Sequence, residues 1–287
     1  MEFAATVVIL TCTYALLAAG VVILYKAARV VNFAHGELAI VGGYVFYSAS
    51  VLGSDSLWLA IAGALVFSII MGVTIYMSML RRLVGEPLHV TILITIGIGI
   101  VLKSAILIIW RAERLTIDVG VAPALRLSGG ASLSYMDLAS VAVTVLFFLA
   151  LYLFLTFTRM GIQFRGTAEN ALLASQRGVN VDFVLALAWI IAVIAASLSG
   201  VFFGSRAFLS TESVTIGLAG LIAALVGGLD SLRGAVAGAF IVAGTQYLTV
   251  RLIDPVLSET VPFLLLLLVM SIRPWGLFGT LEELDRV

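Results

Sequence analysis

Polar and charged side chains at residues 29–38 interrupt two apolar stretches near the start of the chain. Asn32, His35 and Glu37 could bind a polar solute, because polar groups inside a membrane usually face a cavity, a partner or water. Gly42-Gly43 follows, and glycines in membrane helices allow close backbone approach. We interpret this pair as a break in the helix. One hypothesis is a broken helix that lines a transport path. The alternative is an ordinary loop at the membrane surface, with its charges in water.

A glycine-rich stretch at residues 217–239 carries a second group of candidate residues. Gly227, Gly228 and Asp230 interrupt its apolar run. Short or glycine-interrupted segments in both halves of a transporter often mark the substrate pathway. The alternative is tight helix packing through small residues such as Gly238.

Lys103 lies within an apolar run, where a charge is unfavourable. It could pair with a substrate carboxylate or balance a carboxylate elsewhere in the protein. It could also extend toward the membrane surface. Asp137, Asp182 and Glu212 fall at the ends of apolar runs, where we expect water to solvate them.

The polar stretch at residues 159–182 could serve as a contact with another protein. Residues 167–176 predict a short helix with Thr167 as its N-cap, and Arg177-Gly178 suits the end of that helix. One hypothesis is a docking helix presented to a cytoplasmic subunit. The alternative is a helix that lies on the membrane surface.

The sequence does not favour an enzyme or a metal site. His35 and His89 are the only histidines, and zinc usually takes three or four ligands. No Ser/His/Asp cluster is evident, and the phosphate-binding pattern G-x-x-x-x-G-K-[ST] does not occur.

Because that ATP-binding pattern does not occur, any energy for transport must come from a gradient or from a separate subunit. A gradient-driven transporter would carry several ionisable residues inside its spans, and only Lys103, with Glu37 as a weaker candidate, fits that description.

The elements that hold these residues are strongly apolar. Hydrophobic residues make up 62% of the 287 residues, charged residues 11%, and the mean hydropathy is +1.19. Soluble domains contain about 25% charged residues, so a soluble or disordered protein is excluded. Sixteen Lys and Arg balance sixteen Asp and Glu, so no nucleic-acid partner is expected. The single cysteine, Cys12, excludes an internal disulfide. The composition indicates an integral membrane protein.

A membrane-spanning helix needs about 20 mostly apolar residues. Seven runs reach or approach that length: Phe3–Tyr25, Leu38–Leu52, Leu57–Leu80, Val90–Trp110, Met136–Thr158, Phe183–Ser205 and Val261–Phe278. We expect the first to be a retained helix and not a signal peptide. The region 217–250 predicts a short helix, a turn and a full span. None of these runs alternates with a period of two, which argues against a barrel.

The prediction is an all-α integral membrane protein, in which a single transmembrane domain (1–287) forms a polytopic bundle of eight to nine transmembrane helices. A short, Gly-interrupted or re-entrant helix is expected near 217–228. With nine crossings and the N-terminus outside, ten Lys and Arg lie in inside segments and five in outside loops. Eight crossings give a split of eight to seven. Residues 217–228 would span about 18 Å, against a hydrocarbon core of about 30 Å, so a re-entrant helix stays open.

Four motifs, taken together and in this order, resemble the permease subunits of branched-chain amino-acid (LIV-type) ABC transporters. They are Asn-Phe-Ala-His-Gly-Glu at 32–37, Arg-Gly-Thr-Ala-Glu-Asn at 165–170 with Ala174-Ser175 and Gly178-Val-Asn, the glycine-rich run at 224–239, and Arg-Pro-Trp-Gly-Leu-Phe-Gly at 273–279. The sequence departs from the family pattern at Leu229-Asp230, where glycine, or isoleucine followed by glycine, is more usual. That departure bears on the substrate more than on the class of subunit.

The resemblance implies an ABC importer in the bacterial inner (plasma) membrane. Its partners would be a second permease, usually non-identical, two cytoplasmic ATPase subunits, a periplasmic substrate-binding protein and the lipid bilayer. ATP and Mg would bind to the ATPase subunits, so this chain is expected to bind no cofactor. Branched-chain amino acids are the default substrate, and urea or short amides are the alternative. A secondary transporter, a channel or a structural subunit are alternatives of another class.

The resemblance also assigns residues to two roles. Residues 159–182 become a cytoplasmic coupling loop that contacts the ATPase through Arg165, Thr167, Ala168, Glu169, Asn170, Ala174 and Gly178. The resemblance places Asn32, His35, Glu37, Gly227 and Gly228 in the translocation path. We add Lys103 because it lies within a span, and Asp230 because an acidic residue in that turn could alter what passes. We expect Glu169→Arg to uncouple transport while the protein stays in the membrane.

Overall fold

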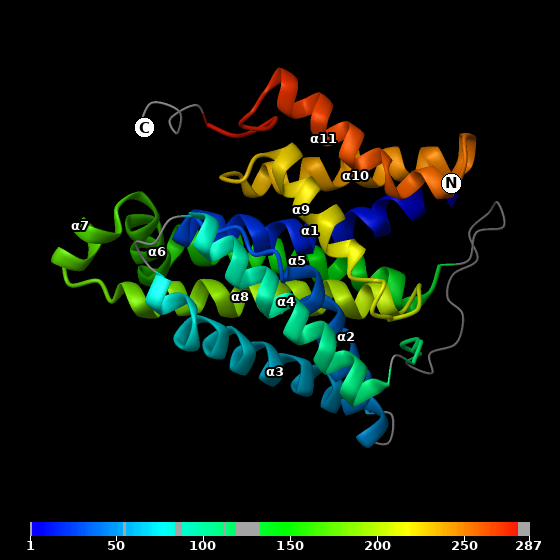
Figure 1. Cartoon of the computed structure of the whole chain (residues 1–287), viewed down its shortest axis with the longest axis horizontal. Coiled ribbons are helices and arrows are strands. Elements are labelled where there is room, and N and C mark those ends of the chain that lie inside the picture. The colour runs from blue at the N-terminus through cyan, green and yellow to red at the C-terminus, as the bar shows by residue number, and fades with distance from the viewer. Residues whose placement is uncertain (1, 54–55, 84–87, 112, 119–132, 281–287) are drawn as a thin grey trace.

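The computed structural model describes residues 2–53, 56–83, 88–111, 113–118 and 133–280. These residues form a bundle of helices (Figure 1). The helices are α1 (Glu2–Ala28), α2 (His35–Leu52), α3 (Leu57–Ser78), α4 (Leu88–Trp110), α5 (Tyr135–Phe157), α6 (Arg159–Glu169), α7 (Ala171–Gln176), α8 (Val181–Gly204), α9 (Thr215–Gly227), α10 (Leu232–Leu252) and α11 (Val261–Ile272), with 3-10 turns η1 (Leu80–Leu83) and η2 (Val256–Glu259).

Six helices in the described part of the chain, α1, α3, α4, α5, α8 and α10, are long and apolar enough to cross a bilayer. α2 has 18 residues, α9 has 13 and α11 has 12. The prediction of an all-helical membrane protein is therefore confirmed. The predicted count of eight to nine spans is not confirmed by length and composition, which support six.

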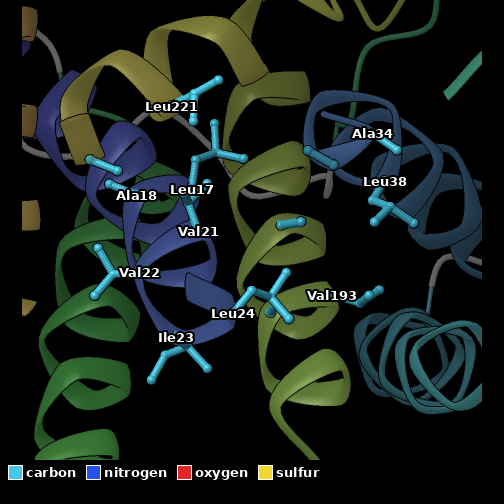
Figure 2. Packing of buried hydrophobic residues seen from close by; sticks show 14 of the residues in the cluster. Leu17, Ala18, Val21, Val22, Ile23, Leu24, Ala34, Leu38, Val193 and Leu221 are labelled. Atoms are coloured by element: carbon cyan, nitrogen blue, oxygen red, sulfur yellow. The ribbon is translucent and has the colours of Figure 1, made fainter. Parts of the chain in front are cut away.

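α1 forms the centre of the bundle, packed against α8, α9 and α10. In its most apolar 18-residue window 89% of residues are buried, against 22–28% in α3, α4 and α5. A helix that is apolar on all sides is stable when it is surrounded by other elements. Figure 2 shows Leu17, Val21 and Leu24 of α1 in this core, with Val193 of α8 and Leu221 of α9 nearby. The outer helices instead expose many apolar side chains, which suit contact with lipid or with another membrane-spanning subunit.

Small residues allow α8 to lie directly against α2. A Cβ atom added at Gly200 would lie 1.8 Å from the carbonyl oxygen of Ala39, and one at Gly42 would lie 2.4 Å from the hydroxyl of Ser197. Gly42-Gly43 therefore acts in packing. The interpretation of this pair as a break is wrong, because α2 continues through it without interruption.

The last apolar run forms a shorter helix than its length of 18 residues predicts. α11 ends at Ile272, and the chain then turns back at Pro274 and at Gly276, whose φ is +82°. The amides of Leu277 and Phe278 donate hydrogen bonds of 2.9 Å to the carbonyls of Val226 and Gly227 at the end of α9. Proline cannot continue the helical hydrogen bonding, so the rest of the run packs as an irregular segment.

Polar contacts gather at two ends of the bundle. At one end, which we call the Asp230 end, the Lys26 ammonium donates to the carbonyl of Asp230, and Asp182 pairs with Arg81 at 2.8 Å. At the other, which we call the Arg206 end, Asp137 at the start of α5 pairs with Arg206 after α8 at 2.5 Å. α6 and α7 follow the end of α5 on the Asp230 side (Figure 1).

The prediction that Asp137 is solvated by water is wrong. Its side chain is 6% exposed, and its second carboxylate oxygen accepts a hydrogen bond from the amide of Ser134 in a capping box. A buried carboxylate needs such partners because burial removes its hydration. Asp182 also has partners, accepting a hydrogen bond from the hydroxyl of Tyr76. Glu212 is exposed, as predicted.

Arg206→Ala should destabilise the protein by up to about 3 kcal/mol, because it leaves the Asp137 carboxylate without its counter-charge. The effect is limited because Arg206 is itself 38% exposed. Glu212→Ala is the matched control: its pair with Arg114 spans 3.9 Å between side chains that are 85% and 69% exposed, so the expected loss is below about 1 kcal/mol. Thermal unfolding in detergent would compare the two variants, and equal midpoints would contradict this assignment.

Candidate functional site

The loop between α1 and α2 is buried at its polar residue Asn32 and at the start of α2. α1 ends at Ala28 and α2 begins at His35, while Asn32 and His35 are each 2% exposed. The side-chain oxygen of Asn32 accepts a hydrogen bond from the amide of Ala34, and the amide of Phe33 donates to the hydroxyl of Thr95 on α4. The alternative of an ordinary loop whose polar groups sit in water is therefore wrong for Asn32 and His35.

This loop returns into the bundle before α2 starts. A Cβ atom added at Gly20 would lie 2.5 Å from the His35 ring, so the ring rests directly on α1 at that residue. Gly20 precedes the end of α1 at Ala28 by eight residues, or about 12 Å of helix. α2 thus begins partway along α1. Irregular backbone at such a depth is tolerated where protein surrounds it or where it lines a cavity.

The start of α9 meets the start of α2 at the same place. A Cβ atom at Gly217 would lie 2.2 Å from the Cα of Gly36, and one at Gly36 would lie 2.5 Å from the carbonyl oxygen of Val214. Two helix N-termini therefore touch backbone to backbone inside the bundle. The free amides of N-termini favour negative charge, and such broken helices form substrate sites in many transporters.

Several polar atoms around this junction are buried without a hydrogen bond in the described part of the chain. They include Nδ2 of Asn32 and both ring nitrogens of His35, although the backbone of Leu17 lies close to the ring. Buried polar groups are normally paired, and exceptions often mark a water or ligand position. The junction of Asn32, His35, Gly36 and Gly217 could therefore hold water or a polar solute.

Glu37 and Lys103 lie together on the neighbouring face of α2 and α4. A Cβ atom at Gly99 would lie 3.1 Å from the carboxyl carbon of Glu37, so this group rests on the bare backbone of α4. Lys103 is one helical turn further along α4 and acts electrostatically on Glu37. The sequence identifies Glu37 and Lys103 as candidates, but it does not indicate that they lie close together.

Gly227, Gly228 and Asp230 are not part of this group. Gly227 lies ten residues, or about 15 Å of helix, beyond Gly217. A Cβ atom at Gly227 would lie 2.0 Å from the carbonyl oxygen of Gly234, and Gly228 has a φ of +111°, which favours glycine. These contacts support the alternative of tight packing for the two glycines.

Asp230 fixes the C-terminal segment to the turn between α9 and α10. Its carboxylate accepts hydrogen bonds from the amide and hydroxyl of Thr280, at 3.0 and 2.6 Å, and its carbonyl accepts one from Lys26. The departure from the family pattern at this residue therefore has a structural explanation.

Asp230→Ala should release the segment 273–280, because the variant loses two hydrogen bonds that contribute about 1 kcal/mol each. We expect faster proteolytic cleavage there in limited digestion, with the rest of the bundle intact. Asp230→Asn keeps one oxygen acceptor and should fall between the variant and the wild type. Equal cleavage of all three proteins would contradict the role given to Asp230.

The polar stretch at 159–182 forms two helices and not one. α6 starts at Arg159, with the hydroxyl of Thr158 accepting a hydrogen bond from the amide of Gly161. The prediction of Thr167 as an N-cap is wrong, since Thr167 is buried within α6. Asn170 is the corner between the helices, and its side-chain oxygen caps α7 at the amide of Leu173. The predicted end is confirmed: α7 stops at Gln176 and Gly178 has a φ of +80°.

The exposed side of these helices, which we call the α6–α7 face, consists of Arg165, Glu169, Asn170, Leu172 and Leu173. Arg165 also donates a hydrogen bond to the carbonyl of Leu155. The remaining members of the predicted coupling set differ in exposure: Thr167 and Ala174 are buried, Ala168 is half-buried and Gly178 is exposed. Leu172 and Leu173 are not among the predicted coupling residues, yet two adjacent exposed leucines beside charges are typical of a protein contact.

Within the described residues, no group of three or more His, Cys, Asp or Glu side chains is placed to hold a metal ion. The site offers hydrogen bonding at the junction and charge at Glu37 and Lys103. The α6–α7 face offers a mixed polar and apolar surface at the end of the bundle.

Comparisons with known proteins agree with these features. Residues 3–270 match the family described as the permease component of the branched-chain amino acid transport system. The chain is 30% identical to the high-affinity branched-chain amino acid transport system permease protein LivH of Salmonella typhimurium, over 98% of this chain and 95% of that protein. LivH of Escherichia coli K12 gives the same identity and coverage. BraD of Pseudomonas aeruginosa, a permease protein of the same description, is 28% identical over 96% of this chain and 94% of its own length.

These relatives are named as transport permeases, which agrees with a transport subunit and not an enzyme, and permeases act with partner subunits in a transport system. The apolar helices agree with a multi-pass membrane protein. The resemblance seen in the four motifs is confirmed over nearly the whole chain, and the protein belongs to the family of branched-chain amino acid ABC transporter permeases.

Proposed function

We propose that this chain is one of two membrane-spanning subunits of an ATP-driven importer that carries branched-chain amino acids. The observation that carries this proposal is the family match over residues 3–270, together with relatives named for branched-chain amino acid transport. A periplasmic binding protein would deliver the substrate. The importer would lie in the bacterial inner membrane.

The proposed topology has nine crossings, with the N-terminus outside. It adds α2, α9 and α11 to the six long helices. The alternating directions of α1–α5 and α8–α11 in Figure 1 support it. In this arrangement the Asp230 end faces the cytoplasm and the Arg206 end faces the periplasm. α2 and α9 both start inside the bundle, so each needs fewer residues than a full span to reach the membrane surface.

The proposed path passes the junction of α2 and α9. Asn32 and His35 supply buried polar side chains there, and Nδ2 of Asn32 has no hydrogen-bond partner among the described residues. Glu37 and Lys103 supply charges on the adjacent face. Gly227, Gly228 and Asp230 act at the cytoplasmic end, where they hold the end of α9 against α10 and the C-terminal segment. Their part in the path is structural in this proposal.

The α6–α7 face is the proposed docking surface for the cytoplasmic ATPase subunits, which bind ATP and Mg. Its polar groups and exposed leucines suit a protein interface, and α6 is joined directly to the end of α5. ATP binding closes the ATPase pair and moves the docked helices. That motion shifts the two permeases between outward-open and inward-open states, because nucleotide binds the two states with different affinity.

Urea or short amides gain no support from the structure as substrates. That alternative came from a sister group of permeases with similar motifs, and the departure at Asp230 weakened the case for branched-chain amino acids. Asp230 binds Thr280, so the departure has a structural role and does not itself favour another substrate. A gradient-driven transporter or channel also lacks a specific observation in its favour.

Purification of the chain from its native membrane in a mild detergent tests the proposal. We expect a second permease and ATPase subunits to co-purify and to be identified by mass spectrometry. The Glu169→Arg variant is the control, because it should purify without the ATPase subunits. A wild-type chain that is isolated alone in several detergents would contradict the importer proposal.

A further inference from the structure

Glu37 and Lys103 place opposite charges on an open face of the bundle. The side chain of Lys103 is exposed, and Glu37 is half-buried with Oε2 lacking a hydrogen-bond partner in the described part of the chain. Lys103 lies well inside the apolar length of its helix, as the sixteenth residue of the 23-residue α4, whereas Glu37 lies in the first turn of α2, which begins partway along α1. Figure 1 shows α4 on the outer surface of the molecule, lying across α2.

This face is unsuited to contact with lipid. A Lys within a transmembrane helix is disfavoured in contact with lipid, and such residues almost always face the interior of an assembly or a water-filled cavity. In the proposed importer the available polar environment is the space between the two permease subunits. The face of α4 that carries Lys103 would then border the translocation path.

The two charged groups lie close to each other, and both can still bind a ligand. They interact electrostatically, yet no direct ion pair joins them within the described residues. The Glu37 carboxylate can approach α4 closely only because Gly99 has no side chain. Each group therefore keeps hydrogen-bonding capacity for a ligand that carries both charges.

The surroundings suit an apolar ligand body. Ile96, Ile100 and Leu107 are exposed and lie on one stripe of α4 with Lys103, at spacings of four, three and four residues. A stripe of branched apolar side chains beside a pair of opposite charges matches the chemistry of a branched-chain amino acid, which is a zwitterion with an aliphatic side chain.

We propose that Glu37 and Lys103 form a transient recognition site for the zwitterion during its passage, with Glu37 binding the ammonium group and Lys103 the carboxylate. This inference rests on the proposed function, since it takes the substrate to be an amino acid. It adds a step of recognition inside the membrane to the selection made by the binding protein.

The test is uptake of radiolabelled L-leucine by vesicles that contain the complete transporter with its binding protein and ATP. Lys103→Met and Glu37→Gln should each lower uptake about 10-fold or more, because each variant loses a charge-assisted hydrogen bond to the ligand. Lys103→Arg should retain most uptake. Ser104→Ala is the matched control beside Lys103 on α4, because the Ser104 hydroxyl donates to the carbonyl of Ile100 on the same helix, and it should leave uptake unchanged.

The exchange of charges, Glu37→Lys with Lys103→Glu, separates recognition from a structural ion pair. Under the proposal the double variant assembles as well as the wild type but does not regain uptake, because the ligand orientation is reversed. Regained uptake would overturn the proposal. Because Lys103 is exposed, Lys103→Met should fold normally, and undiminished uptake in that variant would also overturn it. A wild-type complex that hydrolyses ATP without moving leucine would instead overturn the proposed substrate, and the recognition site with it.

Discussion

Gly217→Ala is expected to push α9 away from α2 and to reduce the amount of folded protein strongly. The added Cβ would lie 2.2 Å from the Cα and 2.6 Å from the amide nitrogen of Gly36. Both contacts are backbone atoms, so no flexible side chain can move aside. Overpacking of this kind destabilises by about 1–3 kcal/mol, and Gly217→Val should have a larger effect.

Gly244→Ala is the matched control for this prediction. Gly244 also lies within an apolar helix, α10, and nothing lies within 4 Å of a Cβ added there. Alanine is preferred over glycine inside a helix by about 0.5–1 kcal/mol, so this variant should be at least as stable as the wild type. Thermal unfolding in detergent followed by size-exclusion chromatography would compare the variants. Equal midpoints for Gly217→Ala and Gly244→Ala would show that the junction of α2 and α9 is absent.

Glu169→Arg is expected to lower transport by at least about 10-fold while the chain remains folded in the membrane. The Glu169 side chain is exposed on the α6–α7 face and makes no ion pair within the residues that the structure describes, so its replacement leaves the bundle unchanged. At an interface, reversal of a charge leaves unpaired or like charges in contact, which disfavours binding by about 2–5 kcal/mol.

The measurement for this variant is the amount of ATPase subunit that co-purifies, together with leucine uptake. Glu212→Arg reverses an equally exposed charge at the opposite, Arg206 end, and should retain the ATPase subunits. Full retention of ATPase by Glu169→Arg, with unchanged uptake, would refute the docking role of the α6–α7 face.

Local patterns in the sequence predicted the helices but not the contacts between them. The apolar runs correspond to α1, α3, α4, α5 and α8, because a continuous apolar segment must satisfy its own backbone. Hydropathy predicted too long a helix for the last run, because the chain turns at Pro274 and Gly276 and returns to α9. It failed again at Asp137, whose partner Arg206 lies 69 residues away.

The candidate site was only partly predictable for the same reason. Asn32, His35 and Glu37 were identified because polar residues stand out in an apolar chain. The rest depends on segments that are distant in sequence: Gly36 meets Gly217, and Asp230 binds Thr280. In the polar stretch, composition suggested one helix, but the capping preference of Asn170 divides it into two.

The central claim is that this permease works in an ATP-driven importer of branched-chain amino acids. The most direct measurement is leucine accumulation in vesicles that contain the complete transporter, with ATP and gradients varied separately. We predict accumulation that requires ATP and the binding protein and that persists when proton and sodium gradients are abolished. Accumulation driven by a gradient without ATP, or by this chain alone, would contradict the account.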